Sequence, residues 1–167
     1  MRVGLLSDTH LAHPEGHLRR VLAEELGDAE VLLHAGDHVG DGVIGYLEDE
    51  EPRPYLAVAG NMDLGVRGRA LPTRRVVQLN GIAVGLVHGW GAPAGLEQRV
   101  LEAFGPDEAR VVVFGHSHRP LARQVGDRWL VNPGSAFHPR GSRRGSVALL
   151  TLEGYRVAVE FRLVGGE

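Results

Sequence analysis

The sequence predicts an α/β fold in which two mixed β-sheets face each other and helices flank them. Two patterns lead to this prediction. In the first two thirds of the chain, short apolar runs alternate with amphipathic segments, which is typical of α/β units. Later in the chain, turn dipeptides that contain glycine separate pairs of apolar runs. Such hairpins argue against a purely parallel sheet.

The first part of the chain carries the clearest strand and helix signals. Strands are expected at residues 3–7, 31–35 and 55–59, where apolar residues run together. A helix is expected over residues 16–26, because leucine and valine recur there on one helical face. The segment 43–48 predicts a second, shorter helix.

The second part is expected to consist mainly of hairpins. The dipeptides Asn80-Gly81, Gly126-Asp127 and Glu153-Gly154 predict turns between neighbouring strands. The flanking strands are expected at residues 76–79, 82–87, 121–125 and 128–131 and on both sides of the last turn, and a further strand is expected over 111–114.

Two segments of this second part are amphipathic. After Pro93, apolar residues recur on one helical face as far as Phe104, so a helix should cover a sheet there. The strand over 155–163 alternates apolar and polar residues, which predicts one packed face and one wetter face. The arginine-rich stretch 140–144 is expected to form a loop.

Composition limits the function classes. A chain of 167 residues with 43% hydrophobic content fits one domain, residues 1–167. The net charge of −3 gives no global attraction for nucleic acid, and the absence of cysteine excludes disulfides and thiolate metal sites. Without a secretory signal or a membrane-length apolar stretch, we expect a cytoplasmic protein that does not enter a membrane.

Metal-type donors follow the predicted strands. Because an open α/β sheet gathers the carboxyl ends of its strands along one edge, these residues can converge although they are far apart in sequence. Asp8 and His10 would point to one side if the backbone there stays extended. Asp37 has two carboxylate oxygens and can bridge two ions. The full set of donors is Asp8, His10, Asp37, Asn61, His88, His116 and His118.

Seven donors suit two divalent ions that share one bridging ligand. Carboxylate, imidazole and amide donors fit several first-row ions; we expect Mn²⁺, with Fe, Zn, Ni and Co as alternatives. Two such cations polarise a phosphoryl group, hold a bridging hydroxide for in-line attack on phosphorus and stabilise the leaving oxygen.

At this point the chain resembles a known family, the calcineurin-like metallophosphoesterases, and in particular their small bacterial and archaeal phosphodiesterase branch. The motifs that carry the resemblance are Ser7-Asp8-Thr9-His10, Gly36-Asp37-His38, Gly60-Asn61-Met62-Asp63, Val87-His88-Gly89, Gly115-His116-Ser117-His118 and Asn132-Pro133-Gly134-Ser135. The resemblance implies a four-layer αββα fold. It also implies one metal held by Asp8, His10, Asp37 and His118, and another held by Asp37, Asn61, His88 and His116.

The expected function is therefore that of a divalent-metal-dependent phosphodiesterase acting on a small phosphoester, with Asp37 and Asn61 in the catalytic centre. His38, beside Asp37, is expected to contact the phosphate or the leaving group, with a purely structural loop role as the alternative. Two other functions stay open: a phosphomonoesterase or nucleotide hydrolase with the same centre, and a non-catalytic scaffold like the retromer subunit that resembles this branch. A homo-oligomer is also compatible with the sequence.

One residue departs from the family pattern. Many members carry histidine near the leaving group where this chain has Met62, and methionine cannot donate a proton, so the source of any general acid is open. Asp63 is expected either to orient Asn61 or simply to make a turn. The segment 132–135 is expected either to place amides or a hydroxyl near the metals or to form an ordinary turn.

Other polar residues also have two interpretations. His34 lies inside an apolar strand, where a buried, hydrogen-bonded side chain is expected. Eight arginines are candidates for binding the remainder of a phosphodiester, with solvated surface as the alternative: Arg67, Arg69, Arg74, Arg75, Arg119, Arg140, Arg143 and Arg144. They lack interleaved aromatic residues, so nucleic acid is not an expected partner.

Overall fold

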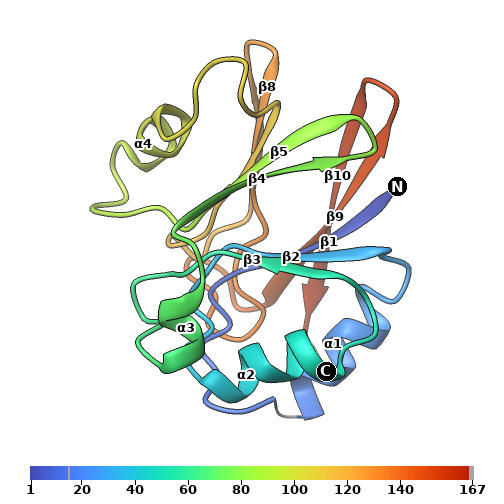
Figure 1. Ribbon diagram of the computed structural model, residues 1–167, viewed down its shortest axis with the longest axis vertical. Helices are drawn as coiled ribbons and strands as arrows, with labels where there is room; N and C mark the ends of the chain where they lie inside the picture. The colour runs from blue at the N-terminus through green and yellow to red at the C-terminus, as the bar shows by residue number, and fades with distance from the viewer. Residues whose placement is uncertain (15, 166–167) are drawn as a thin grey trace.

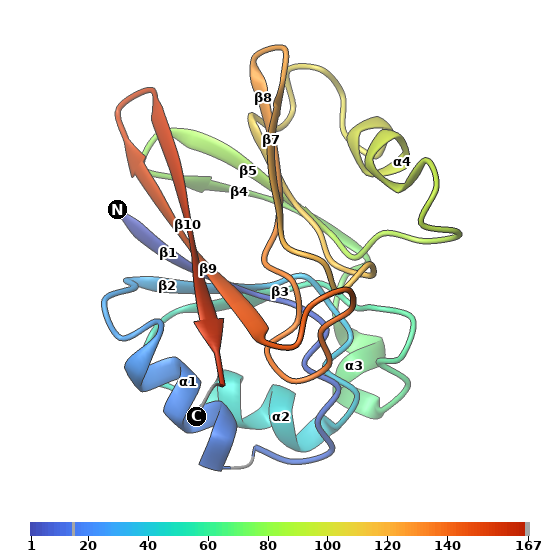
Figure 2. The ribbon, with the colours of Figure 1, turned by 180° about the vertical axis from the view of Figure 1, so that it is seen from behind.

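Two five-stranded sheets face each other in the structure, a computed structural model that describes residues 1–14 and 16–165 (Figures 1 and 2). The first sheet has the order β10-β9-β1-β2-β3 and the second the order β4-β5-β6-β8-β7. The strands are β1 (Arg2–Leu6), β2 (Val31–His34), β3 (Tyr55–Ala57), β4 (Arg74–Leu79), β5 (Ile82–Val87), β6 (Val111–Val113), β7 (Leu121–Val125), β8 (Arg128–Asn132), β9 (Gly145–Glu153) and β10 (Arg156–Val164).

Both sheets are mixed, as the hairpin signals predicted. In the first sheet β1, β2 and β3 are parallel, and the β9–β10 hairpin joins antiparallel to β1. In the second sheet β5, β6 and β8 are parallel, and β4 and β7 pair antiparallel at the two edges. The carboxyl ends of the parallel strands within each sheet therefore lie at one edge of that sheet.

Three apolar clusters hold the layers together. The cluster between the sheets joins residues such as Leu5 and Leu33 of the first sheet to Leu86 and Val113 of the second. A second cluster packs α1 (Gly16–Glu24) and α2 (Asp41–Gly45) on the outer face of the first sheet. A third packs α4 (Leu96–Glu102) on the outer face of the second sheet. The result is the predicted four-layer αββα arrangement (Figure 1).

The helices differ in detail from the prediction. The first ends at Glu24, two residues earlier than expected. The predicted short helix is α2 followed directly by a π-helical turn, η1 (Tyr46–Glu50). The sequence pattern did not reveal α3 (Val66–Ala70), whose side chains are largely exposed. None of the helices in the described part of the chain has the length and apolar character needed to span a membrane.

The apolar face of β10 is less completely packed than its alternating pattern predicted. Val157 and Val159 pack against the core between the sheets. Phe161 and Leu163, further along the same face, are 36% and 47% exposed. Only the first half of the apolar face of this edge strand therefore reaches the core between the sheets. The expected packed face is present at Val157 and Val159 and is half-exposed further along the strand.

Candidate metal centre

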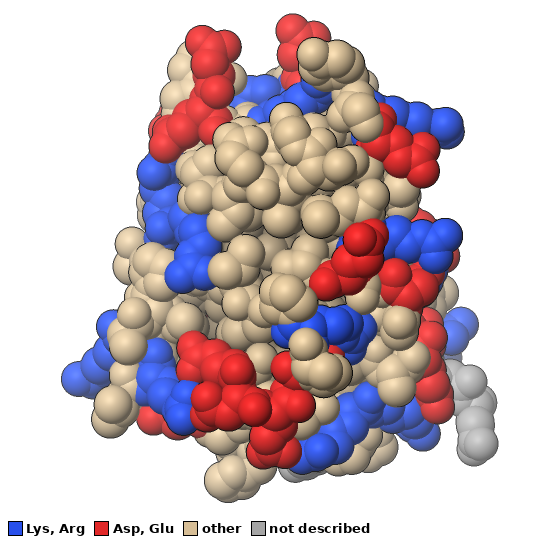
Figure 3. All heavy atoms as spheres, turned by 45° about the vertical axis from the view of Figure 1, so that its right-hand side comes forward, with Lys and Arg blue, Asp and Glu red and all other residues tan. Residues whose placement is uncertain are grey.

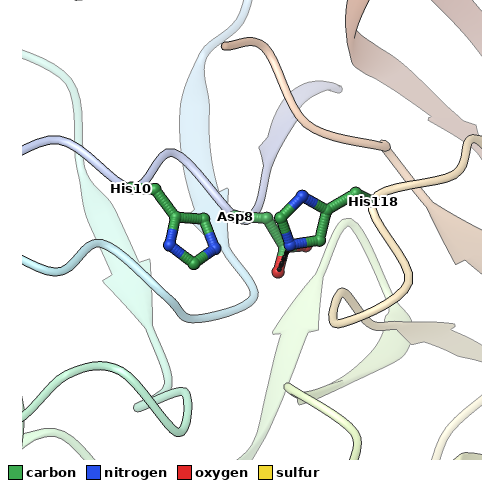
Figure 4. A group of neighbouring side chains, drawn as sticks. All are labelled: Asp8, His10 and His118. Carbon is green, nitrogen blue, oxygen red and sulfur yellow. Dashed lines mark ion pairs between the residues drawn. The ribbon is translucent and has the colours of Figure 1, made fainter. Parts of the chain in front are cut away.

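The residues predicted to bind metal follow the carboxyl ends of parallel strands from both sheets. Asp8 and His10 follow β1, Asp37 follows β2, and His88 follows β5. His118 comes from the segment after β6, and in Figure 4 its ring lies against the Asp8 carboxylate, with His10 on the neighbouring stretch of chain. Segments that are 108 residues apart in sequence meet here, since Asp8 accepts a hydrogen bond from the backbone N–H of His116.

The backbone at these residues is not extended. Asp8, His10, Asp37, His116 and His118 all have positive φ, between 47° and 67°. An L-residue rarely adopts this conformation, and it persists only where the surroundings enforce it. The extended backbone on which the sequence argument for Asp8 and His10 depended is therefore wrong. The side chains converge because the chain turns sharply at each ligand.

Two buried carboxylates form the centre of the site. Asp8 has no exposed surface, and Asp37 is 3% exposed. Oδ1 of Asp37 accepts a hydrogen bond from the Met62 N–H at 2.8 Å, which leaves Oδ2 to face the ring nitrogens of two histidines. That oxygen lies 3.5 Å from Nε2 of His10 and 3.3 Å from Nε2 of His88.

Hydrogen bonds to backbone carbonyls orient the rings of His88, His118 and His116. Nδ1–H of His88 donates to the Ala35 carbonyl at 2.7 Å, and Nδ1–H of His118 donates to the His138 carbonyl at 2.6 Å. In each ring Nε2 is then the unprotonated atom that can bind a cation. His116 is oriented the other way: Nε2–H donates to the Gly91 carbonyl at 2.9 Å, so Nδ1 is its available donor atom.

The side chains form two overlapping groups of donor atoms. One contains Asp8, His10 and His118, and the other contains Asp8, Asp37 and His88; within each group the donor atoms lie within 4.8 Å of one another. Asp8 belongs to both groups, and the Asp37 oxygen that faces His88 also faces His10. Both carboxylates therefore lie between the two groups.

The donor set fits divalent cations. Nε2 of His10 and Nε2 of His88 are buried and have no hydrogen-bond partner among the described residues. No arginine in the described part of the chain forms an ion pair with Asp8 or Asp37. Buried lone pairs and uncompensated carboxylates are costly unless a cation binds them.

The pKa values reflect the same environment. Burial raises the pKa of Asp8 to about 7, although His88 and other neighbours oppose this shift. Burial lowers the pKa of both His10 and His118, which favours their neutral, metal-binding forms. Burial also opposes the charged form of His88, but the neighbouring carboxylates of Asp37 and Asp8 outweigh it and raise the His88 pKa.

Asn61 differs from the other predicted ligands. It lies in the turn after β3, and its side chain is exposed. Its neighbour Gly60 packs directly against Asp37: a Cβ at Gly60 would lie 2.2 Å from Oδ1 of that carboxylate. A similar restriction applies at Gly115, where a Cβ would lie 2.7 Å from Oδ2 of Asp8. These glycines allow the chain to approach the carboxylates closely.

Asp63 holds the Asp37 segment in place. Its Oδ1 accepts hydrogen bonds from the backbone N–H groups of His38 at 2.7 Å and Val39 at 2.9 Å. Its Oδ2 accepts from the backbone N–H groups of Asp37 at 2.9 Å and Gly60 at 2.8 Å. Despite burial, these bonds and the His38 ring hold the pKa of Asp63 well below its usual range. Asp63 thus joins the Asp37 and Asn61 segments, rather than only making a turn.

The placement of His38 overturns its predicted contact with phosphate. The side chain has no exposed surface. Nδ1 bonds to Asp63 at 3.0 Å and Nε2 to the Tyr55 hydroxyl at 2.5 Å, so both ring nitrogens already have protein partners. The ring also stacks on His34, with 3.6 Å between ring centroids. His38 therefore has the structural role that the sequence left as the alternative.

The segment 132–135 supports two of the ligand loops. The Ser135 hydroxyl donates to the Asp8 carbonyl at 2.6 Å, and the Asn132 amide donates to the Gly115 carbonyl at 2.8 Å. Ser135 is fully buried. The sequence left open whether this segment places polar groups near the metals or forms an ordinary turn; in the structure its side chains hold the backbone of the Asp8 and Gly115 segments.

Comparisons with known proteins agree with this geometry. The sequence model of the calcineurin-like phosphoesterase superfamily domain matches residues 1–155. A probable metallophosphoesterase from Methanothermobacter thermautotrophicus is 32% identical over 165 residues, covering 99% of this chain and 94% of the relative.

Solved structures of other proteins share the fold. Vps29 from Entamoeba histolytica, complexed with Zn²⁺, has a TM-score of 0.72 and 22% identity, covering 98% of each chain. A structure described as a novel archaeal phosphodiesterase has a TM-score of 0.72 and 24% identity, covering 97% of this chain and all of that one (100%). At this identity the likeness concerns the fold alone.

Proposed function

The chain belongs to the calcineurin-like phosphoesterase superfamily, and from this premise we propose that it is a divalent-metal-dependent phosphodiesterase with two metal ions in the centre described above. The observation that carries the proposal is the buried pair Asp8 and Asp37, which has imidazole nitrogens on several sides and no arginine partner among the described residues. Such a centre is suited to cations that then bind a phosphoryl oxygen.

In this proposal Asp8, His10, Asp37 and His118 hold one ion, and Asp37, Asn61, His88 and His116 hold the other. The ions, when bound, supply Lewis-acid polarisation of the phosphoryl group and lower the pKa of bound water. The residues of the chain position the ligands: the carbonyls of Ala35 and His138 orient the rings of His88 and His118. The exposed Asn61 amide lies on the solvent side, where substrate enters.

The leaving group receives little help from the residue beside Asn61. Met62 is 43% exposed and has no proton to give. We therefore expect the leaving oxygen to take its proton from water, and esters with good leaving groups to react fastest.

Arg140 is the arginine best suited to hold the substrate phosphate. It lies in the segment whose backbone meets His118, and its charge, after burial, contributes to lowering the pKa of both His118 and His10. Two other candidate arginines are already engaged: Arg67 pairs with Glu48 and Asp49, and Arg74 pairs with Glu108.

The charges on one face of the protein favour a small substrate over a nucleic acid. On the face in Figure 3, arginines alternate with aspartate and glutamate around an uncharged area, and no continuous basic surface lies there. This face therefore lacks the basic track that a nucleic-acid backbone requires.

The test is hydrolysis of bis(p-nitrophenyl) phosphate and p-nitrophenyl phosphate by metal-stripped protein, with and without Mn²⁺. Diester cleavage that requires metal and disappears in Asp37→Asn would support the proposal. Asp127→Asn, on the exposed β7–β8 turn, is the matched control and should keep full activity. Preference for the monoester would favour a phosphomonoesterase, and no cleavage with Mn²⁺, Zn²⁺, Fe²⁺, Co²⁺ or Ni²⁺ would favour a scaffold.

Manganese as the native ion is part of the same proposal. The mixed imidazole and carboxylate donors accept several ions, so affinity alone does not select one. Metal analysis of protein purified without chelators, together with activity restored by each ion in turn, tests it. A native preparation that contains another ion and is most active with that ion would refute manganese.

A further inference from the structure

A pocket of about 500 Å³ opens beside the metal centre. One side is formed by Gly60, Asn61 and His88, and thus by two of the proposed metal ligands. The pocket is also lined by Trp90, by residues of the second sheet and by a residue of the segment after α4. A phosphoryl group at the metals would therefore have one of its ester groups next to this pocket.

The lining of the pocket indicates an uncharged occupant. It is largely apolar, with Ala59, Val87 and Ala103 among the lining residues. Its only arginine, Arg74, is already engaged: its guanidinium forms an ion pair with Glu108, and Nε donates to the Ala103 carbonyl at 2.8 Å. The pocket is thus poorly suited to a second phosphate or a carboxylate, and suited to the organic part of an ester.

Trp90 is the aromatic residue among those that line the pocket. It is 49% exposed, although most large apolar side chains of the protein are buried. Its backbone is fixed: the Trp90 carbonyl accepts a hydrogen bond from Arg99 Nε at 2.9 Å, and the next carbonyl, of Gly91, accepts from His116 at 2.9 Å. A half-exposed indole on a fixed backbone is preorganised for stacking with a planar ring.

We propose that this pocket binds an aromatic ester group of the substrate, such as an aryl ring or a nucleobase, by stacking on Trp90. The proposal rests on the proposed function, because the phosphoryl group must lie at the metals for its ester group to reach the pocket. It makes Trp90 a specificity-determining residue that selects aromatic phosphodiesters over aliphatic ones.

Phosphonates test the pocket without chemistry, because their carbon–phosphorus bond is not an ester. Binding of methyl-, butyl- and phenylphosphonate to Mn²⁺-loaded protein would be measured by calorimetry. We expect phenylphosphonate to bind about tenfold more tightly than methylphosphonate, the effect of one stacked ring. Butylphosphonate, of similar apolar size, should bind more weakly than the phenyl compound.

Variants connect the preference to Trp90. Trp90→Ala should remove the preference for the phenyl compound and leave the affinity for methylphosphonate unchanged. Trp90→Phe should retain most of the preference for the phenyl compound. Tyr155→Ala is the control, since Tyr155 is also exposed but lies at the β9–β10 turn. Because Trp90 is half-exposed, its truncation should not unfold the protein.

The outcomes separate this inference from the proposed function. Three results would each overturn the aromatic subsite: equal binding of the phenyl and methyl compounds by the wild type, equal binding of the butyl and phenyl compounds, or a phenyl preference that survives in Trp90→Ala. In each case, phosphonate binding would still support a phosphoesterase centre. Failure of all three phosphonates to bind would count against both.

Discussion

Replacing Asp63 by asparagine should destabilise the protein and weaken metal binding together. The carboxylate is 3% exposed, and each of its two oxygens accepts hydrogen bonds from two backbone N–H groups. Asparagine has nearly the same shape but only one acceptor oxygen. In either orientation of the amide, its NH₂ group faces two backbone N–H groups that then have no acceptor.

The expected loss of stability follows from the two backbone N–H groups that lose their acceptor. A buried N–H group without an acceptor costs about 1–3 kcal/mol, so the free energy of unfolding should fall by about 2–6 kcal/mol. The Asp37 segment should also loosen, because Asp37 and Val39 have φ of 59° and 82°, a conformation that needs support from the surroundings. Removing a residue that holds a metal ligand in position typically weakens metal binding by about 10–100-fold.

Guanidinium denaturation of metal-free protein, followed by circular dichroism, measures the first effect, and calorimetric titration with Mn²⁺ measures the second. Asp127→Asn makes the same chemical change on the exposed β7–β8 turn and should have neither effect. If Asp63→Asn changes the unfolding free energy by less than about 1 kcal/mol and keeps wild-type metal affinity, the reasoning about this carboxylate is refuted.

Three further predictions follow from the same site. Gly115→Ala should weaken Mn²⁺ binding at least about tenfold, because its Cβ would lie 2.7 Å from the Asp8 carboxylate. Gly105→Ala, whose Cβ meets nothing closer than 3.8 Å, is the control and should bind Mn²⁺ like the wild type. Equal Mn²⁺ titration curves for the two variants would contradict the prediction. Burial lowers the pKa of His34 well below its usual value, so the folded state keeps this side chain neutral, whereas the unfolded chain takes up a proton below about pH 6.5. The stability advantage of the wild type over His34→Asn should therefore shrink as pH falls below about 6.5, by up to about 1.4 kcal/mol per pH unit. Urea denaturation of both proteins across this pH range measures the effect. Saturating Mn²⁺ at about 100 times its dissociation constant should stabilise the protein by about 2.7 kcal/mol, which corresponds to roughly 5–10 °C in melting temperature. Differential scanning fluorimetry with and without a chelator checks this, and an unchanged melting temperature would argue against metal binding to the folded state.

The parts of the structure that depend on local pattern were predictable. Asn80 and Gly81 have φ of 48° and 80°, the backbone that an Asn-Gly hairpin turn requires. The two amphipathic helices also lie on the faces that their spacing indicated. The candidate ligands were found because each stands just after a strand, and strand ends converge whatever the details of the loops.

The rest depends on packing between distant segments. Nothing in the spacing of Asp8 and His10 indicates left-handed backbone at both residues, because segments around residues 36, 115 and 135 impose it. Nothing beside His38 in sequence reveals that its ring bonds to Asp63 and Tyr55, so its position next to Asp37 suggested a catalytic contact that the fold does not allow.

The ligand loops are held by residues that do not face the metals. Asp63 bonds the Asp37 segment, Ser135 bonds the Asp8 carbonyl, and Arg99 bonds the loop that carries Trp90. These contacts involve only protein atoms and fix the backbone that carries the ligands. Metal affinity should therefore depend on these supporting residues as well as on the ligands themselves.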